Sequence, residues 1–223
     1  ADGGLIKKEE LDQLQDIKNR TRITHYLGES TVAVNESLEG VERVRKIVMA
    51  MREFSHPSER EKKLADINHG IETTIAISRN EWKYSTELET NLDPQLPSVY
   101  CQIDEINQVI LNMIINAVQA IQEKYPPETG QKGKITISTY TKESHVYIKI
   151  QDTGIGIPEE IRQRIFDPFF TTKGVGKGTG QGLSLAHQII VQKHKGRIYV
   201  DSMAGEGTTF TIELPMEVPE KET

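Results

Sequence analysis

The sequence predicts an α/β protein in which a long N-terminal helix precedes a mixed β-sheet covered on one face by helices. Three observations lead to this prediction. Apolar residues recur at seven-residue spacing in the first quarter of the 223-residue chain, apolar and polar residues alternate in four later segments, and segments of helical periodicity lie between these. Strands in hairpin-like succession, separated by helices, favour a two-layer arrangement.

The chain is expected to divide into two parts near Pro57. Residues 5–55 contain no proline, whereas all nine prolines lie beyond them, and Pro57 disfavours helix at the residue before it. Residues 1–65 hold 12 Lys and Arg against 12 Asp and Glu, so the net charge of −6 falls on the remainder. We therefore predict a helical segment at 1–57 and an α/β domain at 58–223.

The N-terminal segment is predicted to form one long helix over about 24–54. Residues seven apart fall on the same side of a helix, so the apolar residues form a stripe along one face. The stripe consists of Leu27, Val34, Leu38, Val41, Val44, Ile47, Val48 and Met51. Such a helix would extend roughly 45 Å. Its stripe needs a partner surface, which is either the core of the same chain or a dimerising helical bundle.

The second part alternates between strand-like and helical segments. Strand-like alternation covers 135–139, 146–150, 198–200 and 210–214. Helical periodicity covers 68–79, 104–124, 159–166 and 181–195. The second of these helices has a broad apolar face, which indicates that it packs against the sheet.

Composition argues against several classes of protein. The single cysteine, Cys101, cannot form an internal disulfide, and no apolar run reaches the roughly 20 residues that a membrane-spanning helix needs. The acidic net charge disfavours general nucleic-acid binding. The first residues, Ala1-Asp2-Gly3-Gly4, are interpreted as the start of a cut fragment or a tag remnant. We expect no nucleic-acid partner and no membrane contact for this chain.

Two asparagines, Asn112 and Asn116, lie four residues apart in the helix predicted at 104–124. This spacing puts both amides on one face. Asparagine is a mediocre helix former, so the pair indicates either a functional role or the capping of neighbouring loops. An amide oxygen is a suitable ligand for Mg²⁺, which completes its coordination with water and phosphate oxygens.

The segment 150–158 leaves a strand at Asp152 and passes through Gly154 and Gly156 before Pro158 starts a helix. Glycine lets the backbone adopt positive φ and approach a ligand closely. A carboxylate at the strand end can accept a hydrogen bond from an exocyclic amine, and such a bond contributes roughly 1.5–3 kcal/mol, enough to select adenine over guanine. A simple turn between strand and helix is the alternative.

A glycine-rich segment follows a cluster of three phenylalanines. Its glycines are Gly174, Gly176, Gly178, Gly180 and Gly182. With the basic Lys173 and Lys177, this segment resembles a flexible flap, and the helix that opens at Gly182 and Leu183 offers free amide groups that suit a phosphate. Such an arrangement is typical of a triphosphate site with a lid. A disordered surface loop is the alternative, which the phenylalanines disfavour.

In their order and spacing, these motifs resemble the ATP-binding domain shared by sensor histidine kinases, gyrase-type topoisomerases, a heat-shock chaperone family and mismatch-repair ATPases. The N, G1, F, G2 and G3 boxes of that family are matched by residues 112–117, 152–156, 166–170, 178–182 and 205–208. The F box points to the histidine-kinase branch. The resemblance implies a Bergerat-type α/β sandwich with ATP and Mg²⁺ as cofactors.

The resemblance also implies roles for individual residues. Asn116 would bind Mg²⁺. The adenine pocket would contain Asp152, Gly154, Gly156 and Thr208, and the phosphate site and lid would contain Lys173, Gly178, Gly180, Gly182 and Leu183. Hydrolysing members carry a glutamate one helical turn before the Mg²⁺ asparagine, where this chain has Asn112, and an amide cannot accept a proton from water. Phosphoryl transfer would then rely on metal, positioning and an external nucleophile, with Asn112 and Lys173 as catalytic residues.

One position departs from the family pattern. Many members place a basic residue and an aromatic residue just after the Asn-Ala of the N box, where this chain has Gln119 and Ala120. Neutralisation of the phosphates would therefore depend more on Mg²⁺ and Lys173.

The long helix resembles the second helix of the dimerisation and phosphoacceptor hairpin in nitrogen-regulation-type sensor kinases. The first hairpin helix should carry an acceptor motif, either His-Glu-(Ile/Leu/Val)-Asn-Asn-Pro or His-Glu-Leu-Arg-Thr-Pro. None of the six histidines of this chain lies in such a motif. We therefore expect the acceptor helix to be missing from this chain. The resemblance further implies a homodimer in the full-length protein, a response-regulator receiver domain as partner, and a cytoplasmic location, with any membrane anchor elsewhere in the full-length protein.

The predicted function is that of a protein-histidine kinase. The chain would bind ATP and transfer its γ-phosphate to a histidine on a helical dimerisation domain, for relay to a response-regulator aspartate. An ATPase-driven molecular clamp is an alternative that Asn112 and the apolar stripe disfavour. A second alternative is a nucleotide-binding regulatory module without its own acceptor. A third is an interaction module that binds no nucleotide, in which the glycine flap is only a linker.

Overall fold

The computed structural model describes residues 29–30, 33–34, 37, 40, 61–173 and 178–216. The chain divides into two units, Ala1–Ser58 and Glu59–Thr223. The described residues of the first unit are helical, and the Ser37 hydroxyl donates a hydrogen bond to the Ala33 carbonyl one turn earlier, at 2.7 Å. Except for Val34, the predicted apolar stripe lies outside the described residues, so its role in dimerisation stays a prediction.

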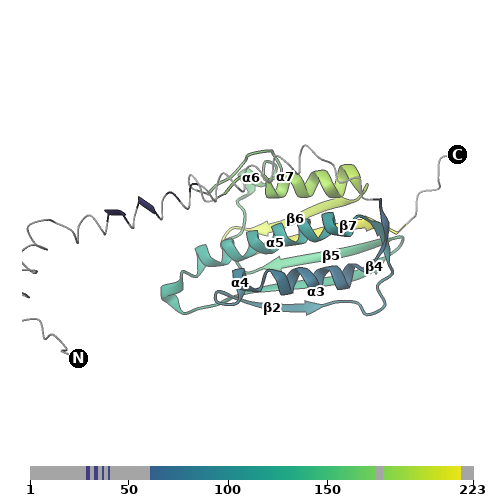
Figure 1. Cartoon of the computed structure of the whole chain (residues 1–223), viewed down its shortest axis with the longest axis horizontal. Coiled ribbons are helices and arrows are strands. Elements are labelled where there is room, and N and C mark those ends of the chain that lie inside the picture. The colour runs from purple at the N-terminus through teal and green to yellow at the C-terminus, as the bar shows by residue number, and fades with distance from the viewer. Residues whose placement is uncertain are drawn as a thin grey trace, which may run out of the picture. The chain divides into compact units, whose positions relative to one another are not determined.

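A five-stranded mixed sheet forms the centre of the second unit (Figure 1). In spatial order its strands are β2 (Thr86–Asn91), β4 (Gly133–Lys142), β5 (His145–Asp152), β7 (Gly207–Pro215) and β6 (Arg197–Met203). Strand β2 runs parallel to β4, and the other neighbours are antiparallel. The predicted mixed sheet is therefore confirmed.

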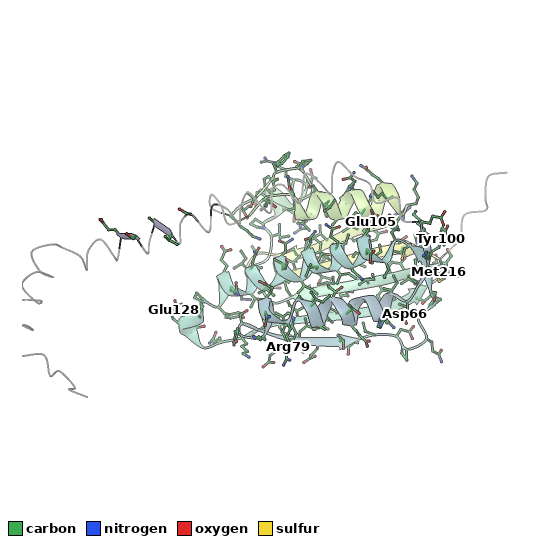
Figure 2. The ribbon with its side chains drawn as sticks, viewed as in Figure 1. Asp66, Arg79, Tyr100, Glu105, Glu128 and Met216 are labelled. Atoms are coloured by element: carbon green, nitrogen blue, oxygen red, sulfur yellow. The ribbon has the colours of Figure 1, made fainter. Side chains whose placement is uncertain are left out.

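Helices cover one face of this sheet (Figure 1). They are α3 (Ile67–Ile77), α5 (Ile103–Lys124) and α7 (Gly182–His187), which continues as the π-helical segment η2 (Gln188–Lys193). In Figure 2, Glu105 near the start of α5 and Glu128 beyond its end lie at opposite ends of the domain, so α5 spans the domain. Within the described ranges, no helix combines the length and the apolar character needed to cross a bilayer.

The core lies between α5 and the sheet. The buried apolar residues of α5 recur at positions i, i+3, i+4 and i+7, as on one face of a helix, and are Ile106, Val109, Ile110, Met113, Ile114, Ala117, Val118 and Ile121. Alternate residues of the strands face them, such as Ile148 and Ile150 of β5, because successive side chains in a strand point to opposite faces. This packing places Asn112 and Asn116 on the half-buried flank of α5.

Several elements differ from the predicted ones. The helix predicted at 68–79 ends at Ile77, and the short helix α4 (Arg79–Trp82) follows. The helix predicted at 159–166 is only α6 (Glu159–Arg162), followed by turns. Strand β2 was not predicted because only its first residue is buried, so it lacks the apolar alternation of a half-buried strand. The three-residue strands β1 (Lys63–Ala65) and β3 (Val99–Cys101) pair in a second, antiparallel sheet, and the short helix η1 (Pro127–Thr129) follows α5.

Candidate functional site

Asp152 ends strand β5 and is almost completely buried, with 6% of its surface exposed. The Gly154 amide donates a hydrogen bond to its Oδ1 at 2.7 Å, and the Thr208 amide donates a second one to the carboxylate. Burial raises the pKa of Asp152 to about 6, although these bonds and the charge of Lys124 act in the opposite direction. Because an ionised carboxylate has about four acceptor positions, capacity remains for a donor from a ligand.

This buried carboxylate makes the stability of the domain depend on pH. Its pKa rises from 3.8 to about 6 on folding, so between these values the folded state binds a proton more tightly than the unfolded chain. The contribution of Asp152 to the free energy of unfolding is therefore favourable at low pH and is lost as the pH rises through about 6.

Comparison with Asp152→Asn isolates this contribution from those of other groups, such as His194, whose pKa is lowered by burial. In urea unfolding between about pH 4.5 and pH 8, the stability of the wild type relative to the variant should fall with rising pH, by about 2 kcal/mol. A difference that is independent of pH would contradict the burial of an ionisable carboxyl.

Both glycines after Asp152 are required by packing within the protein. A Cβ on Gly154 would lie 2.6 Å from the Cβ of Ala120 on α5. Gly156 has φ +71, and its Cβ would lie 2.0 Å from the carbonyl oxygen of Met203. The two glycines were predicted to let the backbone approach a ligand closely. In the structure, the backbone at these glycines closely approaches other protein atoms, Ala120 at Gly154 and Met203 at Gly156.

Thr208 lies beside Asp152 because strands β5 and β7 pair these two residues. Its hydroxyl is buried and lies 3.0 Å from the hydroxyl of Ser202 on β6. The Ser202 hydroxyl also accepts a hydrogen bond from the Ile157 amide at 2.8 Å. Ser202 therefore ties the turn after β5 to the last two strands, a role that no sequence motif indicated.

The second group of predicted residues lies on the half-buried flank of α5. The ammonium of Lys173 donates a hydrogen bond to Asn116 Oδ1 at 3.4 Å and another to Gln119 Oε1. Burial lowers the pKa of Lys173, against the charge of Glu123, which raises it. Asn116 and Lys173 are residues that the sequence predicted for the site, whereas the contact with Gln119, which stands where many family members have a basic residue, was not predicted.

Asn112 lies one turn earlier on α5, next to the start of α7. A Cβ on Gly182 would lie 3.7 Å from the Cβ of Asn112, so the two helices lie close together there, with room for about one methyl group between them. Leu183, the next residue of α7, packs against the core. The structure thus brings the opening of α7 beside the asparagine-bearing flank.

The other predicted phosphate-site glycines lie close to the F-box segment. Gly180 has φ +64, and its Cβ would lie 2.4 Å from the backbone of Phe169. A Cβ on Gly178 would lie 2.8 Å from the hydroxyl oxygen of Thr171. The predicted flap residues Gly174, Gly176 and Lys177 lie outside the described residues.

The two groups lie side by side along α5, because Gly154 contacts Ala120, one helical turn beyond Asn116. The donor set fits Mg²⁺, because Asn116 offers an amide oxygen that already contacts a cationic group. The described residues contain no group of three or more His, Cys, Asp or Glu side chains that could hold a metal ion. A metal bound mainly by phosphate oxygens and water is compatible with that composition.

Comparison with known proteins identifies the arrangement. The family described as histidine kinase-, DNA gyrase B-, and HSP90-like ATPase matches residues 101–218. The chain belongs to this family. It is 35% identical over 181 residues to the signal transduction histidine-protein kinase AtoS of Escherichia coli K12, and 31% identical over 196 residues to the sensor histidine kinase ZraS of the same organism. These matches cover 80% and 87% of the chain.

The catalytic domain of the histidine kinase ThkA is similar in structure, with a TM-score of 0.60 and 30% sequence identity over 70% of this chain and 97% of that one. The resemblance to the histidine-kinase branch and the predicted Bergerat-type fold are therefore confirmed. The second unit contains a histidine kinase ATP-binding catalytic domain. The chain spans only 28% of the length of AtoS and 40% of the length of ZraS.

Proposed function

We propose that the chain is the ATP-binding catalytic part of a protein-histidine kinase, which transfers the γ-phosphate of ATP to a histidine for relay to a response-regulator aspartate. The observation that carries this proposal is the buried carboxylate of Asp152, which retains acceptor capacity beside the asparagine-bearing flank of α5. The similarity to AtoS and ZraS supports it.

In this proposal the nucleotide lies along α5. Asp152 accepts a hydrogen bond from the adenine amine, and Asn116 supplies the protein ligand for Mg²⁺, which neutralises phosphate charge when bound. Thr208 lies beside the base, and Gly154 and Gly156 shape the turn of its pocket. The phosphates are contacted by Lys173 and by the segment that contains Gly178, Gly180, Gly182 and Leu183.

Asn112 and Lys173 are proposed as the catalytic residues for transfer. The bond between the γ-phosphorus and the bridging oxygen of ADP breaks, and a bond from the γ-phosphorus to an imidazole nitrogen forms. Lys173 stabilises the charge on the phosphoryl oxygens. Asn112 can orient groups by hydrogen bonding but cannot deprotonate water, so transfer to an external nucleophile is favoured over hydrolysis.

The proposed partners belong to a two-component phosphorelay. The acceptor histidine is expected on a hairpin helix outside this chain, and the phosphoryl group then passes to a receiver domain. The helix of the first unit would dimerise in the full-length protein, and Val34 of its stripe is exposed in the single chain. A cytoplasmic location follows from the need for ATP and a receiver domain.

Incubation with γ-labelled ATP and Mg²⁺ tests this function. The chain alone should acquire no acid-labile label, whereas an added hairpin with a His-Glu-Leu-Asn-Asn-Pro motif should become labelled on histidine. MgATP should also raise the unfolding temperature, because stabilisation follows RT ln(1 + [L]/Kd). Label on the isolated chain would show that one of its own histidines serves as acceptor.

Two of the alternatives predict different outcomes. Steady release of phosphate by the chain alone would support an ATPase-driven clamp. The absence of any stabilisation by MgATP would support an interaction module that binds no nucleotide.

A further inference from the structure

The ammonium group of Lys173 lies between two side-chain oxygens of α5. It donates to Asn116 Oδ1 at 3.4 Å and to Gln119 Oε1. Asn116 and Gln119 are three residues apart, so their side chains lie on the same face of the helix. Lys173 comes from a segment more than fifty residues further along the chain, so this contact links two distant parts of the site.

The rest of the Lys173 side chain is also fixed in place. Its backbone amide donates a hydrogen bond to the Thr171 hydroxyl at 3.2 Å. A Cβ on Gly178 would lie 3.1 Å from Lys173 Cδ, so the backbone at Gly178 packs closely against the aliphatic stem. The lysine is thus held at its backbone, its stem and its ammonium group.

The two oxygens that contact this ammonium are neutral. Because an ammonium has three donors, contacts with Asn116 and Gln119 leave one N–H for a further acceptor. Lys173 is half-buried, so an anionic group that entered the site would meet a positive charge that is only partly solvated.

We infer that Gln119 is a positioning residue that holds the Lys173 ammonium beside Asn116, where it can receive the terminal phosphates of ATP. This inference rests on the proposed function. Gln119 is uncharged, but its side-chain oxygen accepts a hydrogen bond from Lys173 and so holds the positive charge of that lysine next to α5. Gln119 should therefore matter for the terminal phosphate and not for the adenine, which is assigned to Asp152.

Acylation of lysines with a small amine-reactive reagent tests the positioning directly, with rates read for each lysine by mass spectrometry. In the nucleotide-free full chain, Gln119→Leu should raise the acylation rate of Lys173 by at least about tenfold, because a hydrogen bond to a charged group is lost. Gln119→Glu keeps an acceptor and should leave the rate at or below that of the wild type. Gln122→Leu, an exposed control on the same helix that contacts Ser85, should change nothing.

Nucleotide affinity tests the consequence. Gln119→Leu should weaken MgATP binding by about tenfold and change ADP binding by less than about twofold, since a charge-assisted contact to the terminal phosphate is removed. In the Gln119→Glu variant, addition of Mg²⁺ and ATP should lower the acylation rate of Lys173 further. That result would show that the variant folds and keeps the lysine in the site.

The outcomes separate this inference from the proposed function. Unchanged acylation of Lys173 in a folded Gln119→Leu variant would overturn the inference, whatever the chain does with ATP. Faster acylation with equal loss of ATP and ADP affinity would also overturn it, because Gln119 would then have no selective effect on the terminal phosphate. If the wild type binds no MgATP, the proposed function fails, and with it the role toward phosphate, while the acylation rates still decide whether Gln119 holds Lys173.

Discussion

Asp152→Asn is expected to abolish ATP binding and to leave the free domain folded. The asparagine oxygen can still accept the hydrogen bond from the Gly154 amide, which Oδ1 accepts at 2.7 Å in the wild type. Its NH₂ group then faces the pocket and cannot accept a hydrogen bond from the adenine amine, because both groups are donors. The loss of a charge-assisted bond, together with the opposition of two donors, should weaken binding by about 100-fold or more.

Isothermal titration with a nonhydrolysable ATP analogue measures this loss, and circular dichroism with urea unfolding shows whether the domain is intact. Asp201→Asn is the matched control, because it replaces the same carboxylate by an amide at an exposed position of β6. The variant should also lose its preference for ATP over GTP, since an amide NH₂ can donate to the guanine oxygen. Unchanged ATP affinity of Asp152→Asn would refute the assignment of Asp152 to adenine.

Much of the fold could be predicted because its elements are strongly periodic. Apolar alternation predicted the segments of β4, β5, β6 and β7, and the broad apolar face predicted α5. Strand β2 was not predicted because a polar edge strand lacks this apolar alternation. Its parallel pairing with β4 also depends on contacts between segments that are distant in the sequence. Apolar periodicity arises when one face of a helix or strand is buried, so an element that buries few apolar side chains has no periodic pattern by which to predict it.

The candidate site shows the same limit. The motifs located Asp152 and Asn116, because their residue types are unusual at those places in a strand and a helix. The contact between Gln119 and Lys173 left no local signal, since it joins segments 54 positions apart. Gly156 was recognised as special, but only the structure shows that the atom it must avoid is the carbonyl oxygen of Met203.

Gly156→Ala is expected to damage both stability and nucleotide binding, and Gly205→Ala provides the control. Both glycines have positive φ, +71 and +83, so alanine meets backbone strain of about 1 kcal/mol at each position. A Cβ on Gly156 would lie 2.0 Å from the Met203 carbonyl oxygen, whereas no heavy atom lies within 4 Å of a Cβ on Gly205. Only the Gly156 variant must therefore displace backbone.

That displacement would act on the adenine pocket. The Gly205 amide donates a hydrogen bond to the Ile155 carbonyl at 2.6 Å, and Ser202 joins the same turn to Thr208. Separating Gly156 from Met203 should stretch these contacts, which hold Thr208 beside Asp152. We expect Gly156→Ala to lower the free energy of unfolding by about 3 kcal/mol, against about 1 kcal/mol for Gly205→Ala.

Affinity for MgATP should fall at least about tenfold in Gly156→Ala and less than about threefold in Gly205→Ala, because only the former moves the pocket wall. Urea unfolding and calorimetric titration of both variants check these values. Equal effects of the two substitutions would mean that positive φ alone requires glycine at position 156, and that the contact with Met203 does not set the shape of the pocket. A larger effect at Gly156 on both stability and affinity ties the packing of this turn to nucleotide recognition.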